Sequence, residues 1–348
     1  MTTLAIQHDV PLAPLTTLGL GGRAKHFARA HDEATLVAAL RWAADQGLRA
    51  AILGGGSNLI VPDEGYPGLV VQMALGDLEF LPGGRVIAGA GVHWSAVVEG
   101  AVSRSWAGLE CLAGIPGLAG ATPIQNVGAY GQEVAEVTAE VRVLRRDILT
   151  FESLAPAECV FGYRTSLFKS EPERFVVSSV RFALRPGGRG SLRYDELAKA
   201  VTANASLDEI RRAVLALRRE KSMVLDPGDD NCRSAGSFFL NPIVSASDAE
   251  RISEQAVRDN LVTSPELLPR YPTSDGRVKL AAGWLIEKAG FEKGTRRGAV
   301  GLSTKHALAL VHHGGGTSSE LLAFADEIRA RVRERFGVDL EREPRLLS

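Results

Sequence analysis

Two glycine-rich segments are the first places where this sequence can do chemistry. The shorter one is Leu53-Gly-Gly-Gly-Ser-Asn-Leu59, which directly follows an apolar stretch typical of a β-strand. Three consecutive glycines let backbone N–H groups approach an anion closely, and Ser57 and Asn58 add side-chain donors. The segment predicts a loop that cradles a pyrophosphate. An ordinary glycine-rich turn is the alternative.

The second segment is much longer and runs from Gly108 to Gly131. Small residues dominate it, Ile115, Pro116 and Ile124 are interspersed, and Glu110 is its one charged residue. Such a chain can lie flat against a planar ligand, whereas an exposed loop this poor in charge is unfavourable. Two separate loops of this kind suggest a large, phosphate-bearing cofactor that bridges them, although a loop that only needs tight turns also fits.

Three single residues add reactive groups. Arg164 lies among aromatic and small residues in Phe161-Gly-Tyr-Arg-Thr-Ser-Leu-Phe168, where a guanidinium suits a two-point grip on a carboxylate. Ser237 follows a glycine and precedes two phenylalanines, so its hydroxyl can sit in an apolar pocket. Glu343 lies close to the C-terminus. The ordinary alternatives are a structural ion pair, a strand with a turn, and a solvated tail.

The other motifs give weaker evidence of function. Gly19-Leu-Gly-Gly-Arg-Ala24 fits the loose form G-x-G-x-x-A, but it follows no convincing strand and opens no clear helix, as a dinucleotide fingerprint requires. Cys111, Cys159 and Cys232 lie far apart, which disfavours a disulfide framework and a structural zinc site. We expect no metal.

The elements that must position these residues fall into two halves. Up to about residue 186, short β-rich runs alternate with glycine clusters and two helices, over 32–46 and 95–104. The predicted strands are AAILGGGSN, LVVQM, RVIAGAGV, AEVRVLRR and RFVVSSVRFAL. Residues 185–190 predict a linker, after which the chain becomes helical. Capping-box spacing is present at Ser206–Glu209, Ser247–Glu250 and Thr317–Glu320, and the last box opens a helix that reaches Phe336.

Composition limits the class of protein. The chain has 348 residues, 45% of them hydrophobic and 23% charged, with a formal net charge of -1. This is the composition of a globular protein of two or three domains without the basic face of a nucleic-acid binder. No apolar run approaches the roughly 20 residues that span a bilayer, and the N-terminus lacks the pattern of a signal peptide. We expect a soluble cytoplasmic protein.

Taken together, the motifs resemble one family. The ordered set GGGSNL, GLECLAGIPG followed by GATPIQNVGAYG, FGYRTSLF, SAGSFFLNP, YPTSDGRVKLAAGWLIEKAG and LEREPR is similar to the UDP-N-acetylenolpyruvoylglucosamine reductases (UDP-N-acetylmuramate dehydrogenases). The match covers essentially the whole chain and is closest to the subtype with an extra tyrosine-bearing loop. The first two motifs alone indicate only the wider vanillyl-alcohol-oxidase-like FAD fold.

The resemblance implies an α+β protein with a vanillyl-alcohol-oxidase-like (PCMH-type) FAD-binding fold. Its FAD-binding region would span 1–190, in two subdomains of about 1–75 and 76–190. A smaller α+β substrate-binding domain would span 191–337, and a C-terminal segment, 338–348, would return to the active site. The cofactor would be non-covalent FAD and the hydride donor NADPH, in a monomeric enzyme of bacterial cell-wall synthesis. The small-molecule substrate would be UDP-N-acetylglucosamine enolpyruvate.

Motif position also implies roles for single residues. Ser237 matches the proton donor, and Arg164 and Glu343 match the pair that flanks the enolpyruvyl group. The positions that match cofactor contacts are Gly54, Gly55, Gly56, Ser57, Asn58, Leu59, Ile115, Pro116, Gly117, Gly120, Ala121, Ile124, Gly128 and Ala129. The positions that match the sugar-nucleotide site are Tyr163, Tyr194, Lys221, Asn241, Tyr271 and Arg345.

Alternatives remain at this point. A flavin oxidase of the same cofactor fold predicts a histidine or cysteine tether to the flavin, and His93 is the histidine near the glycine-rich segments. A sugar-nucleotide sensor without turnover is disfavoured, because the three candidate catalytic residues are all present. In the terminal motif, Glu341 replaces Glu343 as the candidate if the register shifts by two residues.

Overall fold

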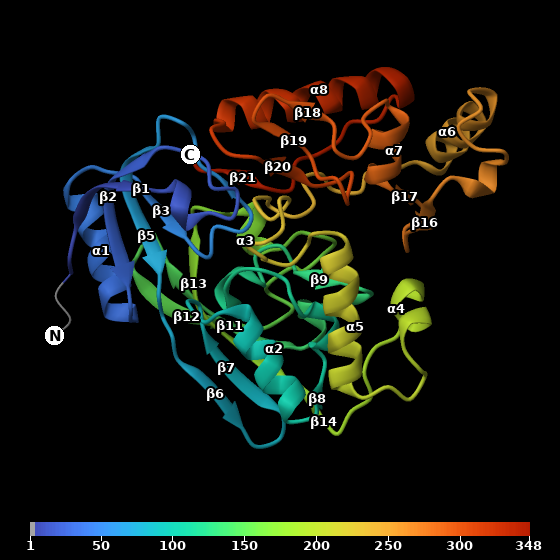
Figure 1. The fold of residues 1–348 in the computed structure, drawn as a ribbon. Helices are drawn as coiled ribbons and strands as arrows, with labels where there is room; N and C mark the ends of the chain where they lie inside the picture. The colour runs from blue at the N-terminus through green and yellow to red at the C-terminus, as the bar shows by residue number, and fades with distance from the viewer. Residues whose placement is uncertain (1–3) are drawn as a thin grey trace.

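The N-terminal part of the chain is a small sheet with one covering helix (Figure 1). The computed structural model describes residues 4–348. The strands of the sheet, in spatial order, are β1 (Gln7–Pro11), β2 (Arg23–Ala30), β5 (Tyr66–Met73) and β3 (Ala50–Leu53). Helix α1 (Glu33–Asp45) packs its apolar side, Leu36, Ala39 and Ala43, on this sheet. Strands β2, β5 and β3 are parallel, so the loop after β3 leaves from the carboxyl edge of the sheet.

The second sheet is antiparallel and supports the long glycine-rich segment. Its strands in spatial order are β12 (Thr150–Leu154), β11 (Thr138–Arg145), β13 (Phe175–Ala183), β7 (Arg85–Gly89) and β6 (Leu78–Leu81). Helix α2 (Trp94–Ser103) buries Trp94, Val97 and Val98 against it. Short strands β8 (Trp106–Ala107), β9 (Gly128–Ala129) and β10 (Gln132–Glu133) lie along the same region, with short helix α3 (Leu167–Ser170) after them.

The five strands predicted from the sequence are all present as β3, β5, β7, β11 and β13. Strands β1, β2, β6 and β12 were not predicted. Arg185–Gly190, predicted as a linker, begins as strand β14 (Arg185–Pro186), which pairs with β8. The chain then forms α4 (Asp195–Ala200) and α5 (Leu207–Glu220). Leu207, Ile210 and Val214 of α5 join the hydrophobic core of the second sheet, so these helices pack on the cofactor side.

The C-terminal part has its own core around one long helix. α8 (Ser318–Phe336) buries Leu321, Phe324, Ile328, Val332 and Phe336, one turn apart down one face. The other elements are β15 (Ile243–Val244), α6 (Ala246–Arg258), β16 (Arg270–Pro272), β17 (Val278–Leu280), α7 (Ala282–Lys288), β18 (Arg296–Arg297), β19 (Val300–Leu302) and β20 (Leu310–His312). Leu18, Leu20 and Ile60 from the N-terminal part complete this core.

Two of the three predicted capping boxes are correct. Ser206 accepts from the backbone N–H of Glu209 at the start of α5, and Thr317 accepts from that of Glu320 at the start of α8. Gly337 ends α8 in the left-handed conformation at φ 69°, which glycine adopts without strain.

The box predicted at Ser247–Glu250 is wrong. Helix α6 begins two residues earlier, where the Ser245 hydroxyl accepts from the backbone N–H of Asp248. Two serines in this short stretch, Ser245 and Ser247, each have an acidic residue three positions later. The contact with Asp248 makes Ser245 the N-cap of α6. The Asp248 carboxylate accepts from the Ser245 hydroxyl at 2.6 Å, which closes the cap.

The C-terminal segment crosses back to the N-terminal part of the molecule (Figure 1). β21 (Arg345–Leu346) pairs in parallel with β4 (Leu59–Ile60), directly after the short glycine-rich loop. Just before β21, Phe239 and Arg342 form an antiparallel bridge. The segment is therefore hydrogen-bonded on both sides to parts of the chain that are far away in sequence.

Within residues 4–348, no helix combines the length and the apolarity that a membrane crossing needs. All three cysteines are free; Cys111 and Cys159 are buried, and Cys232 is half-buried.

Asp63 joins the N-terminal part to the start of α8. Its carboxylate accepts hydrogen bonds from the backbone N–H groups of Ser318 and Ser319, at 2.7 and 2.9 Å, and from the Ser319 hydroxyl. Burial acts to raise the pKa of Asp63, but these hydrogen bonds outweigh it and hold the pKa below its ordinary value of 3.8. The carboxylate satisfies donors that a helix N-terminus leaves open.

We predict that Asp63→Ala lowers the free energy of unfolding by about 1 kcal/mol at neutral pH, because two helix N–H groups lose their acceptor. A carboxyl group with a depressed pKa stabilises above its unfolded pKa and loses this effect on acidification. Urea unfolding should show the difference from wild type shrinking as the pH falls below 3.8. The neighbouring exposed Glu64→Ala is the control. A difference that grows with acidification would contradict the assignment.

Candidate functional site

One cavity of about 350 Å³ collects most of the residues that the sequence singled out. The short glycine-rich loop contributes Gly54–Leu59, and the long segment contributes residues between Ile115 and Gly128. Arg164, Ser237, Glu343 and Arg345 also line it, although they come from three other parts of the chain. The cavity lies where the two sheets meet the C-terminal part.

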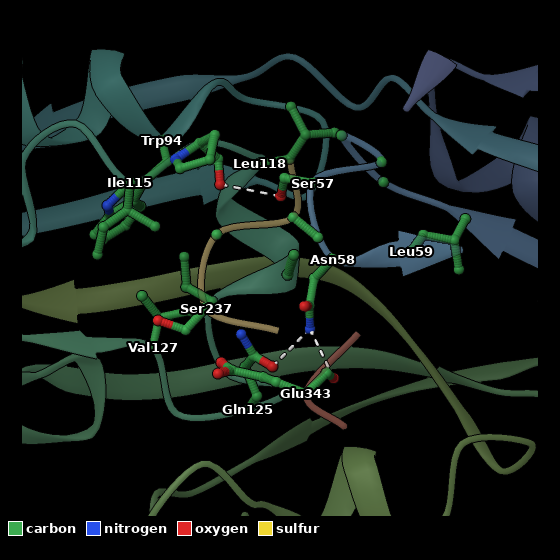
Figure 2. Close-up of a pocket in the computed structure, with 18 of the residues that line it drawn as sticks. Ser57, Asn58, Leu59, Trp94, Ile115, Leu118, Gln125, Val127, Ser237 and Glu343 are labelled. Carbon is green, nitrogen blue, oxygen red and sulfur yellow. Dashed lines mark hydrogen bonds between the residues drawn. The ribbon is translucent and has the colours of Figure 1, made fainter. Parts of the chain in front are cut away.

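The two glycine-rich segments touch directly. A Cβ on Gly55 would lie 2.9 Å from the Gly117 Cα, closer than two carbon atoms allow. The Ser57 hydroxyl donates to the Pro116 carbonyl at 3.1 Å (Figure 2). A Cβ on Gly54, by contrast, would meet nothing within 4 Å. Gly55 therefore serves the packing between the loops, and Gly54 leaves room on the cavity side.

Asn58 connects both loops to the C-terminal segment. Its amide donates to Gln125 Oε1 at 2.8 Å and to the Glu343 carbonyl at 3.4 Å, and Figure 2 shows it between these two partners. The Asn58 carbonyl accepts from the Arg345 N–H at 3.1 Å. One residue of the predicted cradle thus fixes the position of the terminal acid.

Arg164 occupies a strained turn. Gly162 and Thr165 exchange backbone hydrogen bonds at 3.0 and 3.2 Å, so Tyr163 and Arg164 form a two-residue loop. Arg164 has φ 53°, in the left-handed region that costs a non-glycine residue about 1–3 kcal/mol. Lys169 Nζ donates to the Arg164 carbonyl at 2.9 Å and helps to hold this geometry.

The guanidinium of Arg164 is fixed by acceptors on its cavity side. It donates to the carbonyls of Asn126 and Gly128, at 3.5 and 2.5 Å, and its Nε lies 3.5 Å from Glu343 Oε1. A Cβ on Gly128 would lie 3.0 Å from Arg164 Nη1, so the absence of a side chain there permits this approach. The arginine and the acid are the pair that the sequence predicted.

Ser237 and Glu343 are brought together by strand pairing. The Glu343 N–H donates to the Phe238 carbonyl at 3.0 Å, and the Leu240 N–H donates to the Glu341 carbonyl at 2.9 Å. Ser237 precedes this paired stretch. Within residues 4–348 the structure gives its hydroxyl no hydrogen-bond partner, so the group is free to donate to a bound molecule. Of the two terminal glutamates, Glu343 lines the cavity, and Glu341 lines a different pocket.

Burial dominates the electrostatics of Glu343. Its side chain is 13% exposed, and burial raises its pKa, while Arg164 and then Lys169 act in the opposite direction. The net pKa remains above the ordinary value of 4.5. A buried carboxyl with a raised pKa beside a cation is typical of functional sites.

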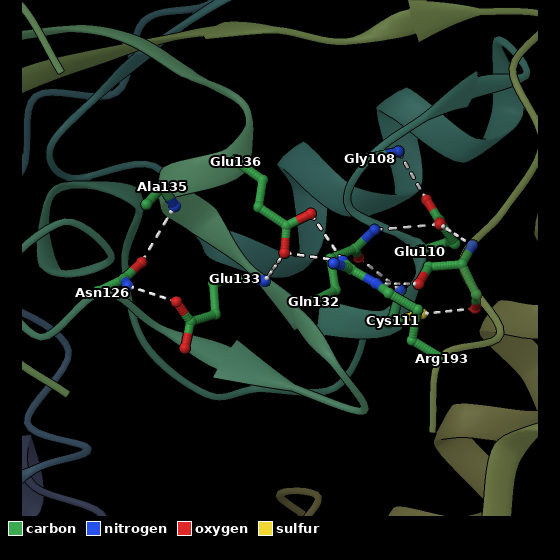
Figure 3. A network of polar contacts seen from close by, with 10 residues as sticks. Gly108, Glu110, Cys111, Asn126, Gln132, Glu133, Ala135, Glu136 and Arg193 are labelled. Atoms are coloured by element: carbon green, nitrogen blue, oxygen red, sulfur yellow. Dashed lines mark hydrogen bonds and ion pairs between the residues drawn. The ribbon is translucent and has the colours of Figure 1, made fainter. Parts of the chain in front are cut away.

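A network of polar contacts holds the long segment in place (Figure 3). Glu110 is fully buried, and its carboxylate accepts from the N–H groups of Gly108 and Ser191, at 2.7 and 2.9 Å, and from the Gln132 amide at 3.1 Å. Gln132 in turn accepts from the Cys111 N–H at 3.0 Å. The single charged side chain of the segment therefore stabilises its conformation through buried hydrogen bonds. This explains how a loop with so few charged residues can hold one conformation.

The same network extends to Arg164 through Asn126. Figure 3 shows the Asn126 amide donating to Glu133 Oε2, at 2.7 Å, and Asn126 Oδ1 accepting from the Ala135 N–H. The same amide also donates to the Gly162 carbonyl at 3.1 Å. Because Gly162 opens the turn that carries Arg164, the glycine-rich segment sets the position of the guanidinium.

Not every predicted cofactor contact lines the cavity. Gly117 packs behind it against Ser57, and a Cβ on Gly120 would lie 2.4 Å from the Ala90 Cβ. Ala129 is in strand β9. Glycine at 117 and 120 therefore serves close packing.

The residues predicted for the sugar nucleotide lie around the cavity, and only Arg345 lines it. Tyr163 and Asn241 line a neighbouring pocket of about 440 Å³. Lys221 forms an ion pair with Glu196 at 2.6 Å. Tyr271 is 49% exposed on strand β16.

These residues around the cavity form an outer group, to which Tyr194, Tyr130 and Lys279 also belong. Tyr194 stacks edge-on against Tyr130, with ring centroids 5.4 Å apart. Lys279 was not predicted; its Nζ lies 4.7 Å from the ring centre of Tyr163 and 5.9 Å from that of Tyr271. Lys279 is the cross-strand partner of Tyr271 in the β16–β17 pair, a relation that no sequence motif reveals.

Other cavity residues were also missed by sequence reasoning. They include Trp94, Leu118, Thr122, Gln125, Val127, Lys169, Arg218, Met223, Val224 and Ala235. Most are apolar, and together they make a wall suited to a flat ring system. Trp94 lies there as the first residue of α2, and its indole N–H donates to the Leu112 carbonyl at 3.1 Å. Apolar side chains of this kind give no signal that separates a pocket wall from a core.

Two further observations concern a metal site and a tether to the flavin. Among residues 4–348, no group of three or more His, Cys, Asp or Glu side chains is placed to hold a metal ion. His93 is solvent-exposed at the N-cap of α2 and is not among the described residues that line the cavity. The position of His93 gives no support to a flavin tethered through it.

Comparison with known proteins identifies the family of this chain. The chain is 46% identical to the UDP-N-acetylenolpyruvoylglucosamine reductase of Thermobifida fusca over 356 aligned residues, covering 99% of each protein. It is 45% identical to that of Streptomyces avermitilis, covering 97% of this chain and 93% of the relative. The chain belongs to the UDP-N-acetylenolpyruvoylglucosamine reductase family.

Domain and structure comparisons agree with membership of this reductase family. Residues 226–347 match the C-terminal domain of UDP-N-acetylenolpyruvoylglucosamine reductase, and residues 24–147 match an FAD binding domain. The crystal structure of the Thermus caldophilus UDP-N-acetylenolpyruvylglucosamine reductase superposes with a TM-score of 0.68 at 26% identity, covering 99% of this chain and 100% of that one. The predicted α+β fold with a PCMH-type FAD-binding part is confirmed.

The cavity of this reductase-family chain fits FAD. Backbone at Gly54 is open toward the cavity, as a phosphate contact requires, and the apolar wall suits an isoalloxazine ring. Gly54–Asn58 would hold the pyrophosphate, and residues from Ile115 to Gly128 would lie against the ring.

Gly55 and Gly54 offer a matched pair of substitutions. We predict that Gly55→Ala costs about 1–3 kcal/mol of stability and weakens FAD binding, because its methyl group forces the two loops apart. Gly54→Ala should change the free energy of unfolding by less than about 0.5 kcal/mol, since the methyl meets open space in the absence of cofactor. Urea unfolding of the apoproteins measures both. Equal costs for the two variants would contradict the loop contact.

The raised pKa of Glu343 predicts that the free energy of unfolding depends on pH. A carboxyl whose pKa is raised by folding stabilises the fold below its unfolded pKa of 4.5, and this contribution is lost as the pH rises through the folded pKa. Glu343→Gln removes this titration while keeping the shape. We therefore expect the variant to gain stability relative to wild type as the pH rises from 4 to 7, measured by urea unfolding at several pH values. A relative loss over that range would refute a raised pKa.

Proposed function

We propose that this chain catalyses the NADPH-dependent, FAD-mediated reduction of UDP-N-acetylglucosamine enolpyruvate to UDP-N-acetylmuramate. One observation carries the proposal: Arg164, Ser237 and Glu343, from three distant segments, line the same cavity as the two glycine-rich loops. Family membership across the whole chain supports the same reaction. The product is a precursor of peptidoglycan, so the enzyme serves cell-wall synthesis and, through it, cell shape and division.

FAD reduced by NADPH supplies the hydride that the terminal vinyl carbon of the enolpyruvyl group accepts. The protein must then stabilise the negative charge that develops on the carbon bearing the carboxylate and the ether oxygen. Preorganised donors aimed at developing charge make a large contribution to catalysis in a cavity shielded from water. Arg164 meets this requirement because its guanidinium is already held by two carbonyls and by Glu343.

Ser237 completes the addition by protonating that carbon. A serine is a weak acid, and the positive charge of Arg164 in the same cavity is what makes its proton available. Glu343, with its raised pKa, stabilises the developing enol together with Arg164. After each turnover, Ser237 regains a proton from solvent.

The outer group of residues binds the sugar nucleotide. Lys221, Arg345 and Lys279 provide positive charge for the diphosphate and carboxylate, and the tyrosine rings provide flat apolar surfaces. Tyr271, exposed on β16, closes over the substrate. NADPH binds in the same cleft before the sugar nucleotide, which explains why the chain needs no second dinucleotide fold.

Cofactor binding and substrate binding fall to successive parts of the chain. Residues 1–190 bind the cofactor in two subdomains, with helices α4 and α5 packed on the second of them. The substrate-binding domain extends from 191 to 337, and the terminal segment 338–348 returns to the active site. The enzyme works as a cytoplasmic monomer on small molecules, without nucleic acid or membrane partners.

We predict that Ser237→Ala leaves the reduction of FAD by NADPH unchanged and slows its reoxidation by the enolpyruvyl sugar nucleotide by about 10²–10⁴-fold, because the proton donor is lost. Anaerobic stopped-flow absorbance at the flavin band separates the two half-reactions. Ser237→Cys, which restores a donor, should recover part of the rate.

Purified protein that cannot take up FAD would overturn the proposed function as a whole. Equal slowing of both half-reactions in Ser237→Ala would overturn only the role of the serine.

A further inference from the structure

Lys169 lies where the turn that carries Arg164 meets the C-terminal segment. It belongs to the short helix α3, is half-buried and lines the cavity. Its Nζ donates to the Arg164 carbonyl at 2.9 Å, and its own carbonyl accepts from Arg345 Nη2 at 2.8 Å. Because Arg345 follows Glu343 by two residues, Lys169 contacts both the arginine turn and the segment that carries the terminal acid.

The backbone of Lys169 is itself held by the long glycine-rich segment. Ser166, the buried N-cap residue of α3, accepts from the Lys169 N–H at 3.3 Å. The Ser166 hydroxyl in turn donates to the Ile124 carbonyl at 2.6 Å. With Arg345 bound to its carbonyl on another side, Lys169 approaches the arginine turn from a fixed backbone.

The turn that carries Arg164 needs such a contact. Its φ of 53° is a strained conformation, which persists only where the surrounding structure enforces it. Two of the three polar contacts of the guanidinium are long, at 3.5 Å to the Asn126 carbonyl and 3.5 Å to Glu343 Oε1. A hydrogen bond from a charged donor is stronger than one from a neutral donor. The ammonium of Lys169 is therefore well suited to fix the backbone from which the guanidinium projects.

The charge of Lys169 also acts on the acid that Arg164 meets. Burial raises the pKa of Glu343, and Arg164 and then Lys169 act to lower it. Lys169 forms no ion pair of its own within residues 4–348. Its hydrogen bond and its charge are thus both directed at the pair of Arg164 and Glu343.

We propose that Lys169 is a positioning residue for the reduction of the enolpyruvyl group. Its ammonium keeps the Arg164 turn in the strained conformation that aims the guanidinium at the developing negative charge. Lys169 acts through Arg164 and does not itself bind the substrate. This inference rests on the proposed function, since that function gives Arg164 its role.

The test uses the FAD-loaded protein. Lys169→Met removes the charge and the donor, and Lys169→Arg keeps both. Lys25→Met is the matched control, because Lys25 is exposed on β2 and does not line the cavity. Lys169→Met is also made in an Arg164→Met background. Anaerobic stopped-flow absorbance at the flavin band follows reduction by NADPH, and then reoxidation over a range of concentrations of the enolpyruvyl sugar nucleotide.

We expect Lys169→Met to lower the reoxidation rate at saturating sugar nucleotide by about 10–100-fold, because a misaligned guanidinium stabilises the developing charge less. The half-saturating concentration and the rate of FAD reduction should change by less than about threefold. Lys169→Arg should recover most of the rate, and Lys25→Met should match wild type. In the Arg164→Met background, Lys169→Met should slow reoxidation further by less than about twofold, since its effect passes through Arg164.

An unchanged saturating rate in Lys169→Met would overturn the inference, and a higher half-saturating concentration would then mean that Lys169 binds the substrate directly. Equal slowing by this substitution with and without Arg164 would also overturn it, as would equal slowing of both half-reactions. If Lys169→Met does not fold, Lys169→Gln, which keeps a neutral donor, decides by the same criteria. Wild type that takes up FAD but is not reoxidised by the sugar nucleotide would instead refute the proposed function, so the two failures are distinguishable.

Discussion

The site depends on one short strand at the end of the chain. Residues 341–343 hydrogen-bond to 238–240, and residues 345–347 hydrogen-bond to 58–60. The first pairing brings Glu343 next to the Ser237 segment, and the second fixes both to the edge of the short glycine-rich loop. Backbone hydrogen bonds of this kind are directional, so they set the register of the acid to one residue. The same segment also contributes Leu347 to the hydrophobic core of the N-terminal part.

Loop rigidity is the second requirement, and buried polar groups supply it. A segment of small residues gains little from hydrophobic burial and would otherwise be free to move. Glu110 and Asn126 replace that missing energy with charge-assisted and amide hydrogen bonds that are all satisfied, as a buried network must be. The strained turn of Arg164 is held by the same network. Strain and rigidity are thus localised where a charge must be stabilised.

The sequence predicted those parts of the site that local chemistry determines. Glycine runs, an arginine between aromatic residues, and a serine before two phenylalanines are visible without a structure, as are helices with strong caps such as α1, α5 and α8. Long-range pairing is not visible in the same way. Strands β1 and β2 gave no signal because their exposed polar positions interrupt the apolar alternation, and Lys279 meets Tyr271 only across a strand pair. The Ser245 cap was missed because Ser247 offered an equivalent spacing.

Arg218 shows why a cavity contains more than its motifs. In the sequence it is one of several arginines near the end of an amphipathic helix, where basic residues are favoured by the helix dipole and usually face solvent. Only the packing of α5 on the second sheet turns this one inward and leaves Arg219 outside.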